Sequence, residues 1–136
     1  MTIRNLDRLL EPASIAVIGA SDRPASVGAT VWRNLRAGKF SGPIYPVNPK
    51  HATLDGQPVF ARPADLPQAP DLAVLCTPAD SVAALTAQLG RLGTRAAIVM
   101  TAGLQAWGGN AYDRICDEFH ASIERAHRRD AFEERQ

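Results

Sequence analysis

Three short apolar segments constrain the fold of this chain most strongly. They read SIAVIGA at 14–20, DLAVLC at 71–76 and RAAIVMT at 95–101. A strand that is apolar at nearly every position, instead of alternating with polar residues, is typical of a parallel sheet whose two faces are both covered by helices. The sequence therefore predicts an α/β protein in which these three segments are buried parallel strands.

Helical hydrophobic patterns follow each of these strands. The pattern of Val27, Val31 and Leu35 stops at Gly38, the helix that has Pro78 at its first position stops at Gly93, and a last helix is expected from about Asn110. Glycine is common at the end of a helix because it adopts backbone conformations that other residues avoid. Strands that alternate with helices predict a Rossmann-like, doubly wound parallel sheet of about five strands. In the helix that ends at Gly93, the expected core positions are Val82, Leu85, Leu89 and Leu92.

Two further elements are predicted nearer the N-terminus. A short leading helix should follow Asn5 as its N-cap, with its three leucines on one face. PIYPV at 43–47 is a strand candidate, and Pro46 favours an edge position because proline cannot donate a hydrogen bond to a neighbouring strand. The proline-rich stretch at 48–70 is expected to be mostly connection.

The size and composition of the chain exclude several classes of protein. The 136 residues have room for one domain spanning 1–136, and a net charge of +1 argues against a dedicated nucleic-acid binder. The charged N-terminus and the lack of a long apolar run argue against secretion and membrane insertion. Cys76 and Cys116 lie far apart and fit neither a disulfide framework nor zinc-ligand spacing. We therefore expect a cytoplasmic protein.

The segments that follow the strands form the candidate binding site, because ligands of doubly wound sheets bind beyond the carboxyl ends of the strands. The segment 19–28 places Gly19 where the backbone would approach a ligand and Gly28 in the opening turn of a helix, whose free N–H groups attract phosphate. This spacing suits a nucleotide diphosphate, but it is not the G-x-G-x-x-G fingerprint. A glycine turn with a purely structural role is the alternative.

The residues after the second strand distinguish among nucleotides. NAD-binding proteins usually place a carboxylate there for the ribose hydroxyls, whereas this chain reads VNPK at 47–50. Lys50 favours an additional phosphate on the ribose, as in NADP or coenzyme A, and a solvated surface lysine is the alternative. Thr77-Pro78 and Thr101-Ala102-Gly103 could hold the middle of a ligand through their backbone, or Thr77 could be only a helix N-cap before Pro78.

Other reactive side chains carry weaker signals. Cys76 has no histidine near it in the sequence and is expected to be a packed cysteine rather than a nucleophile. His51 adjoins Lys50 and could contact a phosphate, although a surface role is favoured. His120 and His127 lie on one predicted helix without a third metal ligand. We therefore assign no catalytic residue and no metal ligand.

Several strings of the sequence, taken in order, resemble the N-terminal CoA-binding domain of the ADP-forming acyl-CoA synthetase family, which is related to the alpha subunit of succinyl-CoA ligase. They are LDRLLEPASIAVIGASDRPASVGATVWRNL, GPIYPVNPKHATLDGQPVF, ADLPQAPDLAVLCTPADSV and AAIVMTAGL, and they cover about residues 6–103. The resemblance implies that the ligand is coenzyme A or an acyl-CoA. The residues that it implies are Gly19, Ala20, Ser21, Val27 and Gly28 around the CoA phosphates, Asn48, Pro49 and Lys50 by the adenosine 3′-phosphate, and Thr77, Pro78, Ala79, Thr101, Ala102 and Gly103 along the pantetheine arm.

The chain also departs from this family. The family adds a strand after its last helix, whereas 110–136 reads as a helix with a polar tail, so the strand at 95–101 is expected to be a sheet edge that a partner subunit or a second copy could cover. No segment resembles the family's phosphohistidine or nucleotide-grasping domains. The resemblance thus implies a CoA-binding module that would support ADP-forming acid–CoA ligation only together with further domains. An NADP-binding oxidoreductase domain and a ligand-free regulatory or interaction module are the alternatives.

Overall fold

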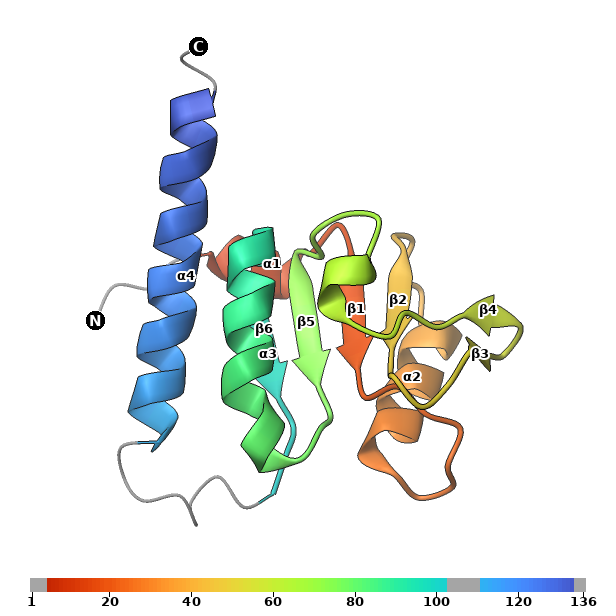
Figure 1. Ribbon diagram of the computed structural model, residues 1–136. Coiled ribbons are helices and arrows are strands. Elements are labelled where there is room, and N and C mark those ends of the chain that lie inside the picture. Colours follow the sequence, from red (N-terminus) through yellow and green to blue (C-terminus); the bar gives the residue numbers. More distant parts are fainter. Residues whose placement is uncertain (1–4, 103–110, 134–136) are drawn as a thin grey trace.

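The structure is a computed structural model in which residues 5–102 and 111–133 are described. Its centre is a parallel sheet of four strands in the order β2-β1-β5-β6 (Figure 1). The strands are β1 (Ile15–Ile18), β2 (Ile44–Val47), β5 (Leu72–Leu75) and β6 (Ala96–Val99), and a separate antiparallel hairpin consists of β3 (Thr53–Leu54) and β4 (Gln57–Pro58). The predicted α/β class and parallel sheet are confirmed, with four strands in the main sheet of the described residues where about five were expected.

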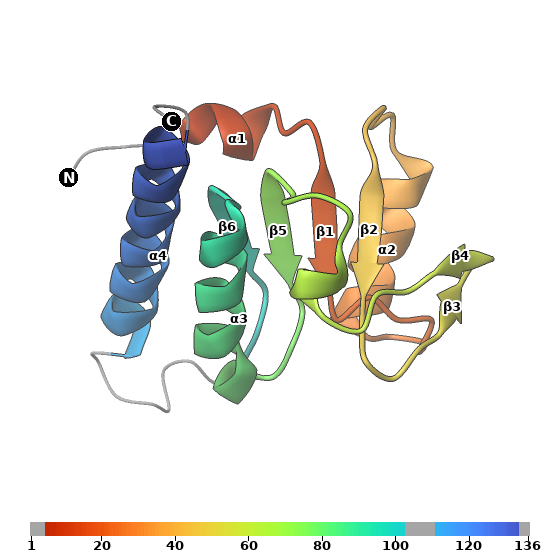
Figure 2. The same ribbon diagram turned by 45° about the horizontal axis from the view of Figure 1, so that its top comes forward.

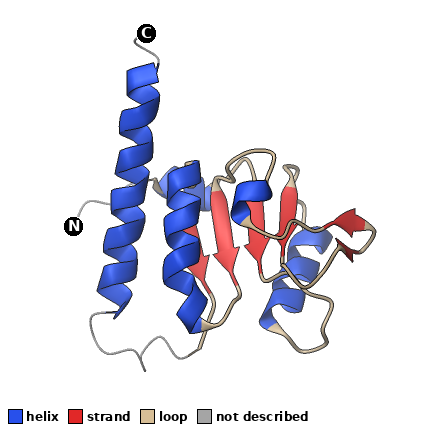
Figure 3. Cartoon of the chain, viewed as in Figure 1, coloured by secondary structure: helices blue, strands red, loops and turns tan. Residues whose placement is uncertain are grey.

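Helices cover both faces of this sheet, as Figures 2 and 3 show. They are α1 (Leu6–Leu10), α2 (Val27–Ala37), the 3-10 helix η1 (Pro63–Asp65) and α3 (Ala79–Leu92), and a further helix, α4 (Ala111–Glu133), packs beside α3 (Figure 2). Ala16 and Leu75 share one buried cluster with Val82 of α3, whereas Ile15 and Leu72 belong to a cluster on the other face that contacts α1 and α2. Because successive side chains of a strand point to opposite faces, two covered faces require strands that are apolar at every position.

Both outer strands behave as the sequence analysis expected. β2, which contains Pro46, is one edge of the sheet, and β6 is the other edge within the described part of the chain. The outer side of β2 is partly covered, because Phe60 bridges to Val47 and its N–H donates to the Pro46 carbonyl at 3.0 Å. β6 pairs only with β5 among the described strands, and the side chains of Ile98 and Met100 at this edge are 39% and 44% exposed. The prediction that this strand is a sheet edge is confirmed.

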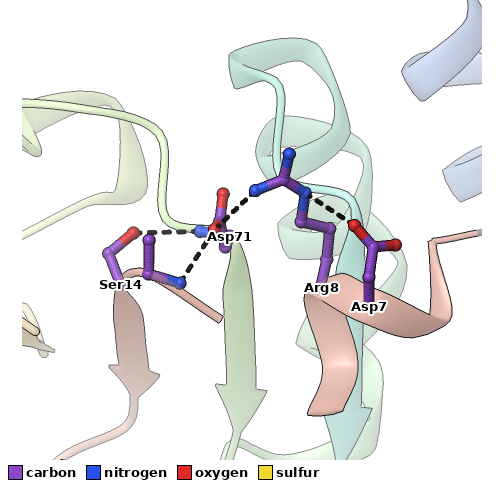
Figure 4. Close-up of polar contacts among 5 residues, drawn as sticks. Asp7, Arg8, Ser14 and Asp71 are labelled. Atoms are coloured by element: carbon purple, nitrogen blue, oxygen red, sulfur yellow. Dashed lines mark hydrogen bonds and ion pairs between the residues drawn. The ribbon is translucent and has the colours of Figure 1, made fainter. Parts of the chain in front are cut away.

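A group of polar contacts closes the amino ends of the central strands (Figure 4). Asp71 Oδ2 accepts hydrogen bonds from the Ala13 N–H at 2.9 Å and from Arg8 Nη1 at 3.2 Å, and the Asp71 N–H donates to Ser14 Oγ at 3.1 Å. Arg8 also forms an ion pair with Asp7, with Nε 3.3 Å from Oδ2. These contacts attach α1 to the start of β1 and β5. We call Arg8, Ala13, Ser14 and Asp71 the amino-end cluster.

The prediction that Leu92 faces the core was wrong, and the three leucines of α1 differ in burial. In α1 only Leu9 packs against the sheet, while Leu6 is 46% and Leu10 is 69% exposed. In α3, Leu92 is also exposed, and Thr86 is buried instead. Thr86 can occupy an apolar environment because its hydroxyl donates to backbone carbonyls of its own helix, at 3.0 Å for Val82. Periodicity finds the apolar positions of a helix but does not see a polar side chain that its own backbone satisfies.

Candidate functional site

The carboxyl ends of all four parallel strands meet at one edge of the sheet, marked by the arrowheads in Figure 1. Backbone hydrogen bonds of 2.8 Å join the residues there: the Gly19 N–H donates to Val47, the Cys76 N–H to Ile18, and the Met100 N–H to Leu75. The segments that start at 19, 48, 76 and 100 therefore lie next to one another. They contain all the candidate site residues except Gly103, which lies outside the described residues.

Gly19 and Gly28 allow three backbones to pack against each other at this edge. Gly19 has φ +90°, and a Cβ atom there would lie 2.6 Å from the carbonyl oxygen of Cys76. A Cβ atom on Gly28 would overlap the carbonyl oxygen of Gly19, so the first turn of α2 rests directly on the end of β1. The structural role that the sequence analysis held open is therefore real for both glycines, and it places the start of α2 against the strand ends.

The loop from Ser21 to Ser26 is organised by its own side chains. The Arg23 N–H donates to Ser21 Oγ at 2.9 Å, and the Ser26 N–H donates to the Arg23 carbonyl at 3.2 Å. Ser26 is the N-cap of α2, and its hydroxyl accepts a hydrogen bond from the Ala29 N–H at 3.1 Å. The first N–H groups of a helix have no intrahelical partner. Those of Val27 and Gly28 have no hydrogen bond within the described residues, so they are free for a ligand or water.

Asn48 connects the second candidate segment to the first. Its side-chain amide donates to the Ala20 carbonyl at 3.0 Å, and its Oδ1 accepts the N–H of Lys50 at 2.9 Å. Lys50 itself is exposed. The carbonyl of Ala20 and the backbone of Lys50 are thus linked through the side chain of Asn48, a structural role that the sequence did not predict.

The third segment differs from its prediction. Thr77 does not cap α3: Pro78 is the N-cap, with extended backbone, and Ser81 Oγ donates to its carbonyl at 2.7 Å. The hydroxyl oxygen of Thr77 is buried and has no hydrogen-bond partner within the described residues. Its methyl group lies beside Gly19. A buried hydroxyl without a partner is costly. Within the described residues, the hydroxyl oxygen of Thr94, just before β6, is also buried without a partner.

The thiol of Cys76 is partly buried just after β5. Burial raises the pKa of the Cys76 thiol to about 11, so the thiol is protonated near neutral pH. Residues 5–102 and 111–133 contain no group of three or more His, Cys, Asp or Glu side chains that could hold a metal ion. Within the same residues, none of the helices has the length and apolar character needed to cross a membrane.

Two residues of the site were passed over in the sequence analysis. Ser26 precedes the apolar positions of α2 and caps it, a pattern that the N-cap preference for serine could have identified. Arg23 is an exposed cation in the middle of the loop between Gly19 and Gly28. Arg23 could have been identified from the sequence, because it lies between two glycines that follow a buried strand. A cation in such a loop favours an anionic ligand.

Comparison with known proteins identifies relatives of this chain. The family described as "CoA binding domain" matches residues 13–131. A trans-feruloyl-CoA synthase from an unknown prokaryotic organism is 46% identical over 105 residues, and acetate–CoA ligase [ADP-forming] I of Archaeoglobus fulgidus is 38% identical over 103 residues. These matches cover 77% and 76% of this chain, and the chain spans only 15% of the length of either relative.

A subunit and a solved structure are similar in the same region. The alpha subunit of acetate–CoA ligase [ADP-forming] II from Pyrococcus furiosus is 32% identical over 103 residues, which are 76% of this chain and 22% of that subunit. The apo dinucleotide-forming acetyl-coenzyme A synthetase 1 of Ca. Korarchaeum cryptofilum superimposes with a TM-score of 0.80 at 33% identity, covering 86% of this chain and 26% of that one. The chain therefore belongs to the CoA binding domain family, and its relatives include ADP-forming acyl-CoA synthetases.

Proposed function

We propose that this chain binds CoA or an acyl-CoA across the carboxyl ends of its strands, with the diphosphate at the start of α2 and the adenosine 3′-phosphate at Lys50. The observation that carries the proposal is the link through Asn48, which joins the loop before α2 to the Lys50 backbone. A helix N-terminus and a lysine held beside each other suit a ligand with two separate phosphate groups.

The proposed positions of the diphosphate and the 3′-phosphate assign roles to the other candidate residues. Gly19, Ala20, Ser21, Val27 and Gly28 would surround the diphosphate, and Asn48 and Pro49 would shape the loop that carries Lys50. Thr77, Pro78 and Ala79 would flank the pantetheine arm, where the hydroxyl of Thr77 is the group that needs a hydrogen-bond partner. Thr101 and Ala102 follow β6 at the same edge.

The first test is calorimetry of the purified chain with CoA, dephospho-CoA, NADP and NAD. We expect CoA to bind most tightly and dephospho-CoA to bind more weakly. Tighter binding of NADP than of CoA would overturn the proposal in favour of a nicotinamide nucleotide. Binding of none of the four would favour a regulatory or interaction module.

The residue test is Lys50→Ala. If Lys50 forms a charge-assisted contact with the 3′-phosphate, CoA affinity should fall by roughly 1–2 kcal/mol, or about 5–30-fold. Affinity for dephospho-CoA should not change, because that ligand lacks the phosphate. Lys39→Ala is the matched control, since Lys39 is also exposed and follows the far end of α2. Unchanged CoA affinity in Lys50→Ala would return Lys50 to the solvated surface. An equal loss for both ligands would place its contact on a part that the two ligands share, instead of on the 3′-phosphate.

The activity of the whole protein is a further part of the proposal. We propose that the chain contributes CoA binding to an acid–CoA ligase of the ADP-forming type and supplies no catalytic residue. The relatives that carry this name are several times longer than the stretch this chain matches. The two free cysteines, Cys76 and Cys116, suit the reducing cytoplasm, which is the proposed location.

The outer edge of β6 is the proposed contact with a partner subunit or a second copy of the chain. Because hydrogen-bonding groups alternate along a strand, and the N–H groups of Ala96 and Met100 bond to the neighbouring strand, those of Ala97 and Val99 face outward. If a second copy covers this edge, light scattering should give a mass above the 14.6 kDa of one copy. If a different subunit covers it, that subunit should co-purify with the chain. Ile98→Lys should abolish either association, since lysine at a sheet edge opposes strand pairing. A monomer that binds CoA and melts cooperatively would argue against any need for a partner.

A further inference from the structure

Trp32 attaches the β3–β4 hairpin to α2. Its indole Nε1 donates a hydrogen bond to Asp55 Oδ2 at 2.8 Å, across 23 positions of sequence. The ring is 2% exposed, packs in one cluster with Leu54, and lies under the guanidinium of Arg36, whose Cζ is 5.2 Å from the ring centroid. An indole held on several sides has little freedom to follow the hairpin if the hairpin moves, so the hydrogen bond fixes the hairpin relative to α2.

The turn of the hairpin is shaped to bring Asp55 to this position. Asp55 and Gly56 have φ values of +49° and +76°, and two successive left-handed residues are typical of a tight two-residue hairpin turn. Aspartate tolerates this conformation better than most residues. Leu54, one position earlier, is 3% exposed in the cluster that contains Trp32. The hairpin therefore contacts α2 through both an apolar and a polar side chain.

The segment that carries Lys50 connects the end of β2, next to the Ala20 carbonyl, with this hairpin. At its start, Asn48 is bonded to the Ala20 carbonyl through its side chain and to the Phe60 carbonyl through its N–H, at 3.0 and 2.9 Å. At its end, the Ala52 carbonyl accepts the N–H of Val59 at 3.0 Å, at the base of the hairpin. The position of Lys50 is thus determined from one side by Asn48 and from the other by the hairpin.

We propose that the Trp32–Asp55 hydrogen bond positions Lys50 and so sets the preference of this site for a ligand with a ribose phosphate. α2 carries the N–H groups of Val27 and Gly28 at its start and Trp32 in its middle. A single rigid helix therefore fixes the separation between the diphosphate-binding end and the segment that holds Lys50. Trp32 and Asp55 are positioning residues that do not touch the ligand. This inference rests on the proposed binding of CoA at the same edge.

The experiment compares the ratio of Kd for dephospho-CoA to Kd for CoA in four variants of the full chain. Trp32→Phe keeps an aromatic ring but removes the N–H donor, and we expect it to lower the ratio at least about 3-fold, against the roughly 5–30-fold ratio expected of the unmodified chain. The Kd for dephospho-CoA should change by less than about 2-fold, because the diphosphate end of the site is untouched. Asp55→Asn retains a side-chain oxygen that can accept the indole N–H and should preserve the ratio.

Two further variants make the result specific. Tyr45→Phe removes another hydrogen bond between an aromatic side chain and a loop, the 2.9 Å bond donated by Gln68, and should leave the ratio unchanged. Asp55→Ala removes the hydrogen-bond acceptor and should lower the ratio as much as Trp32→Phe does. If Trp32→Phe does not fold, Asp55→Ala serves as the test. The positioning role is overturned if the ratio stays constant in Trp32→Phe and Asp55→Ala while Lys50→Ala lowers it to about one. The proposed function then stands. A ratio near one in the unmodified chain would overturn the proposed contact of Lys50, and the positioning role with it.

Discussion

The two ends of the central strands differ in how their polar groups are arranged. At the amino ends, the amino-end cluster pairs the Asp71 carboxylate with the Ala13 N–H and with Arg8 (Figure 4). At the carboxyl ends, two glycines bring backbones together, the hydroxyl of Thr77 has no partner within the described residues, and Lys50 is exposed. Polar groups that are satisfied within the chain contribute to stability, whereas ligands of doubly wound sheets bind beyond the carboxyl ends of the strands. The comparison predicts that variants at the amino ends change stability without changing CoA affinity.

Gly28→Ala should have the largest effect and should break the carboxyl-end arrangement. The new methyl group would overlap the Gly19 carbonyl, and because backbone must move to relieve the overlap, we expect a loss of at least about 3 kcal/mol of unfolding free energy. Chemical denaturation followed by circular dichroism measures it. Gly56→Ala is the control: its methyl group meets nothing within 4 Å, so only the strain of φ +76° remains, about 1 kcal/mol. Equal losses would show that α2 can shift away from β1 at little cost.

Asp71→Ala should have an intermediate effect at the other end. It removes the acceptor for the Ala13 N–H and Arg8, and we expect roughly 1–3 kcal/mol of lost stability. The CoA affinity of the folded fraction should be unchanged, which calorimetry well below the melting temperature can measure. Asp65→Ala, which removes an exposed ion pair with Arg62, should cost less. If Asp71→Ala weakens CoA binding, the two ends are coupled and the comparison fails.

The ionisation of Cys76 should have the smallest effect near neutral pH, where the thiol is protonated in both the folded and the unfolded chain. Burial raises the pKa of its thiol to about 11 in the folded chain, while in the unfolded chain the thiol ionises near its ordinary value, about 8.5. Above that ordinary value the unfolded state gains from ionisation and the folded state does not, so stability falls as the pH rises toward 11. The fall should be shallower in Cys76→Ala over the same interval. Parallel pH profiles of the two proteins would show that the thiol does not contribute.

The sheet and its two covered faces were predictable because the relevant signal is local. Three runs without polar residues, each followed by a helical pattern, specify buried parallel strands, and Pro46 correctly placed β2 at an edge. The position of β6 at the other edge also followed from the order of the elements. Helix ends were less predictable: threonine is a common N-cap residue, yet α3 begins after Pro78 and the Thr77 hydroxyl has no hydrogen-bond partner within the described residues.

The parts of the site that could not be predicted depend on contacts between distant positions. The sequence suggested phosphate binding by Gly19 and Gly28, but it could not show that each glycine is also required by the backbone of another segment. The links from Asn48 to Ala20 and from Trp32 to Asp55 join positions 28 and 23 residues apart. No spacing rule predicts such pairs, because they arise only when the crossover folds onto the sheet.

The order of the strands also determines when this chain can fold during synthesis. β1 lies between β2 and β5, and the amino ends of β1 and β5 are joined by a bond between Ser14 and Asp71, 57 positions apart. A ribosome adding about 5–20 residues per second needs roughly 3–11 seconds to make the intervening chain. Throughout that time the entirely apolar IAVI strand lacks one of its two neighbours. Slower translation lengthens this exposure, so the yield of folded chain in a cell should depend on the elongation rate between β2 and β5.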